Sequence, residues 1–498
     1  MGASQGVSQD DDKVPKTFSE LEAEMRSKFP DSRRRAVKHL VEIGTDDAWE
    51  WVLRALEDPL GQVADEAQLA LPKLPDERRW KLLLGKEGLA HDDPWVRVRM
   101  AEVVGRTTQA LDARKLLRAL DPRDPVAART LLRSLVQKAG GNGLTDVPRR
   151  WGNELRPCLT RRKEPWLRAE ALAAWFALDP EEAGGSVLDG TRDKSGHVRA
   201  AALLCLTAQD TRGVAVDGAA LREATRLIVD EDAHVRWVAV ECLGRLGTKA
   251  ALEVLIARLG VEPRERIERR VVERLQARSG LFHRRDPRPW RDWVRDLPPS
   301  GGPSRPAQPP ENRGDSVAGT TRLPITSDRL AFLIDMSGSI WNVRDDGTRR
   351  KDEIDVIVHQ TIDALPDGVR FNLVPFAGQP VLWQDDGLAT ASKRTRREAR
   401  TWYDDLKLTG PGDFEGAVRR VLLDPEIDTL CVLTDGAPTG GRRWHLEMMM
   451  QLLLAETRFR PVTFDVVLVD ASRAAERRWD VLCVGSGGEL TSRTLKGR

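Results

Sequence analysis

The sequence predicts a multidomain protein, in which an all-α helical-repeat solenoid is followed by an α/β doubly wound, mostly parallel sheet. Three observations predict this fold class. A chain of 498 residues is too long for one ordinary hydrophobic core. The N-terminal half repeats a helical pattern at a period of about 30–40 residues, which is typical of helical-hairpin arrays. The remainder alternates short β-like runs with amphipathic stretches, as parallel sheets covered by helices do.

The composition is that of a soluble globular protein. Hydrophobic residues make up 40% and charged residues 31%, and the mean hydropathy is −0.43. The net charge of +2 provides no overall field toward nucleic acid or lipid, and no apolar run approaches the roughly 18 residues of a membrane span. We therefore expect neither nucleic acid nor a membrane as a partner. The N-terminus has no apolar core of a signal peptide, which predicts a cytoplasmic location and leaves an extracytoplasmic one open.

The repeats follow a head, residues 1–17, that we expect to be disordered. In each copy an acidic or proline turn precedes a basic residue and then apolar positions at helical spacing. The clearest copies begin at Asp31, Asp93, Glu164, Lys194, Glu231 and Glu262. One helix pair cannot bury its apolar face alone, so neighbouring copies are expected to stack into one continuous core over residues 18–297.

One arginine recurs at a fixed place in these copies, at Arg97, Arg168, Arg199 and Arg236. Such a series predicts a structural ladder, in which each arginine pairs with an acid or helix C-terminus of the next copy. The alternative is a row of phosphate-binding side chains. The opening D-x-x-V-R-x-x-A of the copies resembles HEAT repeats, and Trp290 and Trp293 predict a capping helix at the open end of the array.

Residues 298–317 are rich in proline, glycine and serine and predict a linker, and residues 318–498 form the second domain. Strands are predicted over 330–335, 369–376, 381–384, 428–435 and 462–470, with a weak strand near 488–492. Helices are predicted over 352–365, 391–406, 414–423, 442–457 and 473–483.

The first and fourth of these strands both end in an acid, Asp335 and Asp435. In the strand order 3-2-1-4-5-6 these two strands are neighbours, and ligands bind beyond their carboxyl ends. Ser337 and Ser339 follow Asp335 on the same loop. Two carboxylates repel unless a cation lies between them, and an all-oxygen set suits Mg²⁺ or Mn²⁺. The strand ends therefore predict a metal site.

Residues 325–495 resemble the von Willebrand factor type A domain with its metal-ion-dependent adhesion site, through "LIDMSGSI" and "VLTDGAPTG". The resemblance implies that Ser337 and Ser339 bind the ion (Mg²⁺, or Mn²⁺ or Ca²⁺) and that the two aspartates act largely through water. One metal position stays open for a partner's carboxylate. The third loop departs from the family, because Gly412 stands where a threonine is expected. Asp413 or Thr409 could supply the oxygen, or this loop supplies none.

These inferences predict a metal-dependent protein-binding scaffold and not an enzyme. The second domain would bind an Asp or Glu carboxylate of a protein partner through the ion, and the array would offer a second interaction surface, which allows bivalent capture. One alternative is a structural scaffold whose metal site has degenerated, which the glycine at position 412 favours. A metal-dependent hydrolase is a further alternative, but the loops beside Asp335 offer no histidine as general base. The last alternative is a nucleic-acid adaptor that binds through the basic repeats.

Overall fold

The structure is a computed structural model that describes residues 16–74, 80, 83–211, 218–302, 323, 325–344 and 347–494. Most of the predicted head (1–17) and linker (298–317) lie outside the described residues, and both stay predictions. None of the helices in the described part of the chain is long and apolar enough to span a membrane.

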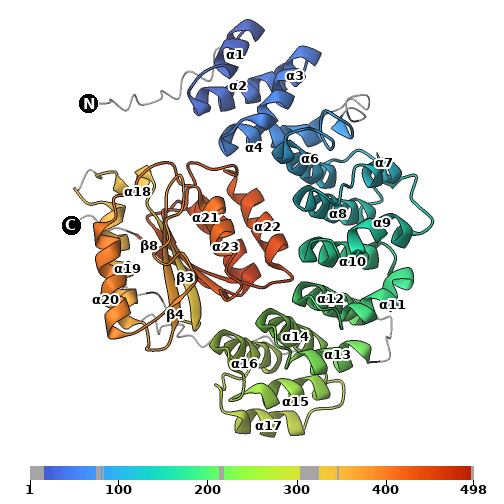
Figure 1. Ribbon diagram of the computed structural model, residues 1–498, viewed down its shortest axis with the longest axis vertical. Coiled ribbons are helices and arrows are strands. Elements are labelled where there is room, and N and C mark those ends of the chain that lie inside the picture. Colours follow the sequence, from blue (N-terminus) through green and yellow to red (C-terminus); the bar gives the residue numbers. More distant parts are fainter. Residues whose placement is uncertain are drawn as a thin grey trace.

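The N-terminal part is an array of helices that stack into a curved solenoid (Figure 1). Its helices are α1 (Phe18–Met25), α2 (Pro30–Ile43), α3 (Asp46–Arg54), α4 (Gly61–Ala70), α6 (Pro94–Arg106), α7 (Ala113–Arg118), α8 (Pro125–Gly140), α9 (Trp151–Leu159), α10 (Pro165–Leu178), α11 (Pro180–Gly190), α12 (Gly196–Thr211), α13 (Ala219–Leu227), α14 (Ala233–Leu246), α15 (Lys249–Arg258), α16 (Glu265–Ser279) and α17 (Pro287–Arg295). The acidic turns that marked each copy start these helices. Asp93, Asp124 and Asp232 each cap a helix, accepting a backbone N–H at its first turn.

The predicted arginine ladder is confirmed. The Arg97 guanidinium donates to Asp124 at 2.7 Å, and Arg199 donates to Asp230 at 2.9 and 2.6 Å. Arg168 pairs with Asp193, and Arg236 donates to Glu262 at 2.9 Å. Each acid lies in the turn that precedes the next helix pair, so the ladder joins consecutive copies. These arginines are therefore used within the array.

Two further features complete the array. Trp290 of α17 is fully buried, and its indole N–H donates to the Arg284 carbonyl at 2.8 Å, in agreement with the predicted capping helix. The short strands β1 (Leu111–Asp112) and β2 (Leu144–Thr145) pair in parallel between α6 and α9. Two residues are too short for a strand pattern, so these strands could not be predicted from the sequence.

The C-terminal domain is a six-stranded sheet with helices on both faces. Its strands are β3 (Arg329–Asp335), β4 (Arg370–Phe376), β5 (Ala389–Thr390), β6 (Thr429–Thr434), β7 (Thr463–Val469) and β8 (Leu490–Arg493), in the order β5-β4-β3-β6-β7-β8. The predicted order 3-2-1-4-5-6 is confirmed. All neighbouring pairs are parallel except β4 and β5.

The edge strand differs from the prediction over 381–384, because β5 takes that place. The amide N–H groups of Val381 and Trp383 do donate to the carbonyls of Pro375 and Leu373, both at 2.9 Å. However, Pro375 has no N–H to donate in return, so the ladder there is incomplete. The regular pairing moves to β5, where Ala389 lies opposite Phe371.

The helices of this domain are α18 (Gly338–Trp341), α19 (Arg350–Ala364), α20 (Lys393–Asp405), α21 (Phe414–Val421), α22 (Leu446–Thr457) and α23 (Arg473–Ser486). α19 and α20 cover one face of the sheet, over Phe332 and Phe371, and α21, α22 and α23 cover the other, over Val432 and Phe464. Strands buried on both faces explain the nearly continuous apolar runs in the sequence.

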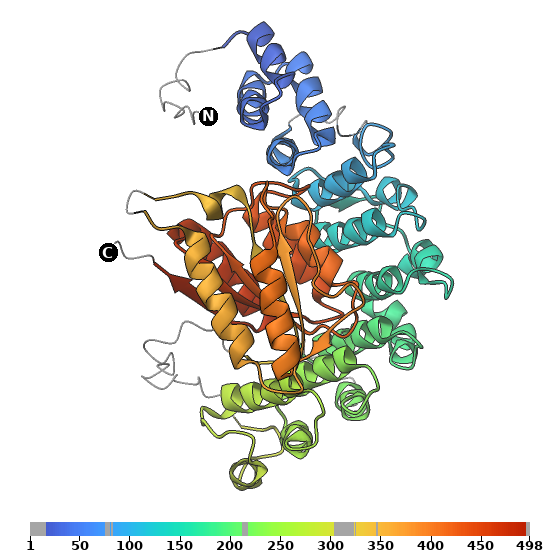
Figure 2. The ribbon, with the colours of Figure 1, turned by 60° about the vertical axis from the view of Figure 1, so that its left-hand side comes forward.

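The sheet domain lies in the concave side of the array, and its α22 face is turned toward α8, α10 and α12 (Figures 1 and 2). Polar contacts join the two along the arc. Arg458, which follows α22, pairs with Glu170 of α10, and His234 of α14 lies 3.2 Å from the carbonyl oxygens of Pro425 and Pro461. Arg266 of α16 donates to Thr463 Oγ1 at 2.9 Å. The domains, expected as modules on a linker, thus share an extensive interface.

Candidate metal centre

The predicted meeting of Asp335 and Asp435 follows from the strand order. β3 and β6 are parallel neighbours, with Ile334 opposite Leu433. Asp335 ends β3, and Asp435 comes directly after β6. Both acids therefore lie at one edge of the sheet, at the point where the strand order reverses.

The Asp335 carboxylate is buried and held by two donors. Asp335 is only 2% exposed. Its Oδ1 accepts the Ser337 amide N–H at 2.8 Å, and its Oδ2 accepts the Thr434 hydroxyl at 2.6 Å. Burial raises the pKa of Asp335 to about 6; its hydrogen bonds to Thr434 and Ser337 oppose this rise, and the nearby Asp435 adds to it. Burying the ionised carboxylate costs free energy, which a cation at this place would offset.

The two serine hydroxyls lie side by side next to this carboxylate. Ser337 Oγ and Ser339 Oγ are 3.1 Å apart. Neighbouring oxygens around an octahedral Mg²⁺ at about 2.1 Å are separated by roughly 3 Å, so the spacing suits two ligands of one ion. Ser337 stands at the N-cap of α18, but its side chain makes no capping hydrogen bond. Its hydroxyl is therefore not committed to starting the helix.

The third loop places Gly412 beside these serines, as the resemblance implies. A Cβ built on Gly412 would lie 3.1 Å from Ser337 Cβ and 3.5 Å from Ser337 Oγ. Asp413, the predicted substitute ligand, caps α21, because its Oδ1 accepts the Gly416 amide N–H at 2.9 Å. Burial raises the pKa of Asp413. Thr409 is exposed. A ligand role for Asp413 stays a prediction.

Two threonines at the site were missed from the sequence. Thr434 holds Asp335 through its hydroxyl, and Gly412 N–H donates to Thr439 Oγ1 at 2.7 Å. The signal for Thr434 was its place at the end of a buried strand, directly before Asp435. Thr439 gave no such signal, because its contact with residue 412 depends on the path of the loop between β6 and α22.

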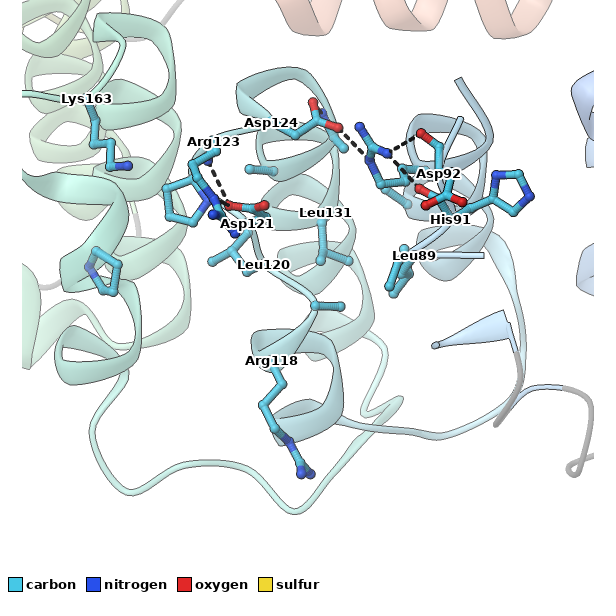
Figure 3. Close-up of a pocket in the computed structure, with 18 residues that line it drawn as sticks. Leu89, His91, Asp92, Arg118, Leu120, Asp121, Arg123, Asp124, Leu131 and Lys163 are labelled. Carbon is cyan, nitrogen blue, oxygen red and sulfur yellow. Dashed lines mark hydrogen bonds and ion pairs between the residues drawn. The ribbon is translucent and has the colours of Figure 1, made fainter. Parts of the chain in front are cut away.

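Among the described residues, we also searched for acid, histidine and cysteine clusters and for cavities outside this end of the sheet. In the described ranges, no three His, Cys, Asp or Glu side chains gather into a set that could hold a metal, so the candidate centre rests on two carboxylates and on hydroxyls. A cavity of about 790 Å³ lies in the array between α6, α8 and α9 (Figure 3). Its acids Asp121 and Asp124 pair with Arg123 and Arg97, so these charges belong to the repeat scaffold.

Comparison with known proteins identifies both parts of the chain. Residues 186–276 match the family of HEAT repeats, and residues 328–477 match the von Willebrand factor type A domain. The chain therefore carries HEAT repeats followed by a von Willebrand factor type A domain. Both are protein-interaction modules, and their combination supports a protein-interaction scaffold. No curated protein matches the chain.

Three solved structures that are similar to the chain each cover part of it. The conserved hypothetical protein BatB from Bacteroides thetaiotaomicron is 14% identical over 34% of this chain and 90% of its own, with a TM-score of 0.25. A von Willebrand factor type A protein from Catenulispora acidiphila is 18% identical over 33% of this chain and 38% of its own, with a TM-score of 0.27. Human deoxyhypusine hydroxylase is 22% identical over 52% of this chain and 95% of its own, with a TM-score of 0.23.

Proposed function

We propose that the chain is a metal-dependent protein-binding scaffold. Asp335, Ser337, Ser339 and Asp435 would hold one Mg²⁺, or Mn²⁺ in its place, directly or through water. The ion would supply a Lewis-acidic position for an Asp or Glu carboxylate of a protein partner. The observation that carries the proposal is the pair of hydroxyls, 3.1 Å apart, next to a buried carboxylate at the switch point of the sheet.

The array would bind a second protein partner. Its interface with the sheet domain limits which of its surfaces are free for that partner. Glu170, His234 and Arg266 of the array already contact the sheet domain. The second partner's surface is therefore expected on the outer side of the array. Because the domains are packed together, the two binding surfaces keep a set distance, and a partner that spans both would gain from preorganisation.

Water relaxation with Mn²⁺ tests the open metal position. Mn²⁺ bound to the full chain enhances the relaxation of water protons through the water it still carries. We expect a short peptide with a central Asp to lower this enhancement, because its carboxylate displaces that water. The same peptide with Asn in place of Asp should have little effect. Equal effects of the two peptides would contradict carboxylate recognition by the ion.

A further inference from the structure

The metal site lacks a side-chain oxygen at Gly412, although its backbone lies where the resemblance expects a ligand. The loop after β6 lies against this glycine. Gly412 N–H donates to Thr439 Oγ1 at 2.7 Å, and Thr439 N–H and Gly440 N–H donate back to the Gly412 carbonyl at 3.3 and 3.0 Å. The third loop and the loop after β6 are therefore tied together at residue 412.

The Thr439 hydroxyl lies close to the space that a side chain at 412 would fill. A Cβ built on Gly412 would be 3.5 Å from Thr439 Oγ1 and equally 3.5 Å from Ser337 Oγ. A threonine hydroxyl has two lone pairs, and the Gly412 N–H occupies one of them. The second lone pair is available for a cation. In Asp413, in contrast, one carboxylate oxygen already accepts a hydrogen bond from a backbone N–H in the first turn of α21.

We propose that Thr439 supplies the metal-site oxygen that position 412 cannot supply. This inference rests on the proposed function, because it assigns a ligand to the same ion. It also explains how the site tolerates the glycine: the donor has moved from the third loop to the loop that carries Asp435.

The test compares four variants of the full chain by calorimetric titration with Mg²⁺ and Mn²⁺. Thr439→Val keeps the shape of the side chain but removes the hydroxyl, and we expect it to weaken metal affinity about tenfold. Thr439→Ser keeps the hydroxyl and should bind like the native chain. Asp413→Asn keeps a good N-cap and tests the alternative ligand of the third loop. Asp335→Ala should lose binding altogether.

The four results separate the two proposals. If Asp335→Ala binds metal like the native chain, the proposed function is wrong. If Asp335→Ala loses binding while Thr439→Val keeps it, only the assignment of Thr439 is overturned. A loss in Asp413→Asn without one in Thr439→Val makes Asp413 the ligand. An equal loss in Thr439→Val and Thr439→Ser also overturns the assignment, because the serine retains the proposed donor.

A second, independent observation concerns how the array contacts this loop. The Gly441 carbonyl accepts the Gly61 amide N–H of α4 at 2.8 Å, and the Arg442 carbonyl accepts the Arg99 guanidinium of α6 at 2.5 Å. The Trp444 and His445 amide N–H groups both donate to Asp65 Oδ2, at 2.7 and 2.8 Å. A Cβ on Gly61 would lie only 2.8 Å from backbone atoms of Arg442 and Arg443, so the approach requires glycine.

Asp65 is the centre of this contact. It is fully buried, and its other oxygen pairs with Arg99. α22 begins at Leu446, after the predicted start at residue 442, and Trp444 and His445 directly before it donate their N–H groups to the array. The path from Asp435 to α22 is thus set in part by the array.

We infer that Asp65 is a positioning residue for the metal centre, acting through the backbone of the loop that carries Asp435 and Thr439. Like the assignment of Thr439, this rests on the proposed function. The HEAT array would then contribute to metal affinity without contacting the ion. Removing the hydrogen bonds between Asp65 and the loop would lower that affinity.

Asp65→Ala in the full chain is expected to weaken Mg²⁺ affinity about tenfold, as loss of an outer partner of a metal site does. Arg266→Met is the matched control, because it removes another buried contact of the array, to Thr463, away from the loop. It should leave metal affinity within about twofold of the native value. If Asp65→Ala does not fold, Asp65→Asn, which keeps one acceptor, should show a smaller loss of the same sign.

Unchanged affinity in the Asp65 variants would overturn this inference, provided that Asp335→Ala has lost binding. An equal loss in Arg266→Met would overturn it as well, since the effect would then come from the interface as a whole. Weaker metal affinity in the Asp65 variants, with near-native affinity in Arg266→Met, would support the positioning role of Asp65.

Discussion

Asp335→Ala is expected to abolish binding of Mg²⁺ and Mn²⁺, with affinity falling by more than about a hundredfold. Even partners outside the ligand shell of a metal are worth roughly 10- to 100-fold, and Asp335 is one of only two matched carboxylates at the site. The substitution also removes the acceptor for the Ser337 amide and the Thr434 hydroxyl. The loop that presents the two serines would lose its anchor at the same time as the ion loses charge.

Asp428→Ala is the matched control for this variant. Asp428 is also buried, its pKa is also raised to about 6 by burial, and it also accepts hydroxyl hydrogen bonds, from Ser327 and Thr429. It lies directly before β6, at the opposite end of the strand from Asp435. Calorimetry should show native metal affinity for Asp428→Ala. Equal losses in the two variants would mean that the effect is one of folding and not of metal binding.

Arg443→Met is expected to lower the free energy of unfolding by about 3–5 kcal/mol, the cost of removing one partner from a buried ion pair. The Arg443 side chain is 1% exposed and donates to Glu102 Oε1 at 2.6 Å and to Gln68 Oε1 at 2.8 Å. These partners belong to α6 and α4, so the arginine joins the sheet domain to the array. Without it, Glu102 would remain largely buried with Gln68 as its partner.

Urea unfolding, followed by tryptophan fluorescence, measures this effect. Arg442→Met is the control, because Arg442 directly precedes Arg443 in the chain and its side chain lies over the Trp95 ring, 5.6 Å from the centroid. A cation–π contact of this kind contributes about 0.5–1 kcal/mol. Equal destabilisation of the two variants would contradict this prediction, because the buried ion pair of Arg443 would then stabilise the fold no more than the cation–π contact of Arg442 does.

The parts of the structure that the sequence predicted depend on local pattern or on general rules of topology. The ladder of Arg97, Arg199 and Arg236 followed from the spacing of one residue type, because every copy repeats the same local geometry. The meeting of Asp335 and Asp435 followed from the strand order, because parallel strands bring their carboxyl ends to one edge.

The parts that could not be predicted depend on contacts between distant segments. Asp65 and Trp444 are separated by 379 residues, and neither local sequence contains a pattern that predicts their hydrogen bond. Thr439 lies by Gly412 because the loop after β6 folds back across the third loop. The failure of 381–384 to form a strand has a different cause, since Pro375 on the neighbouring strand lacks the N–H that a regular ladder needs.

Anomalous diffraction from crystals of the full chain grown with Mn²⁺ would locate the ion. One strong anomalous peak is expected at the carboxyl ends of β3 and β6, within ligand distance of Ser337 Oγ and Ser339 Oγ and next to Asp335. Crystals of Asp335→Ala grown in the same way should lack it. A peak at another place in the chain, or no peak in native crystals grown at millimolar Mn²⁺, would contradict a metal centre at Asp335.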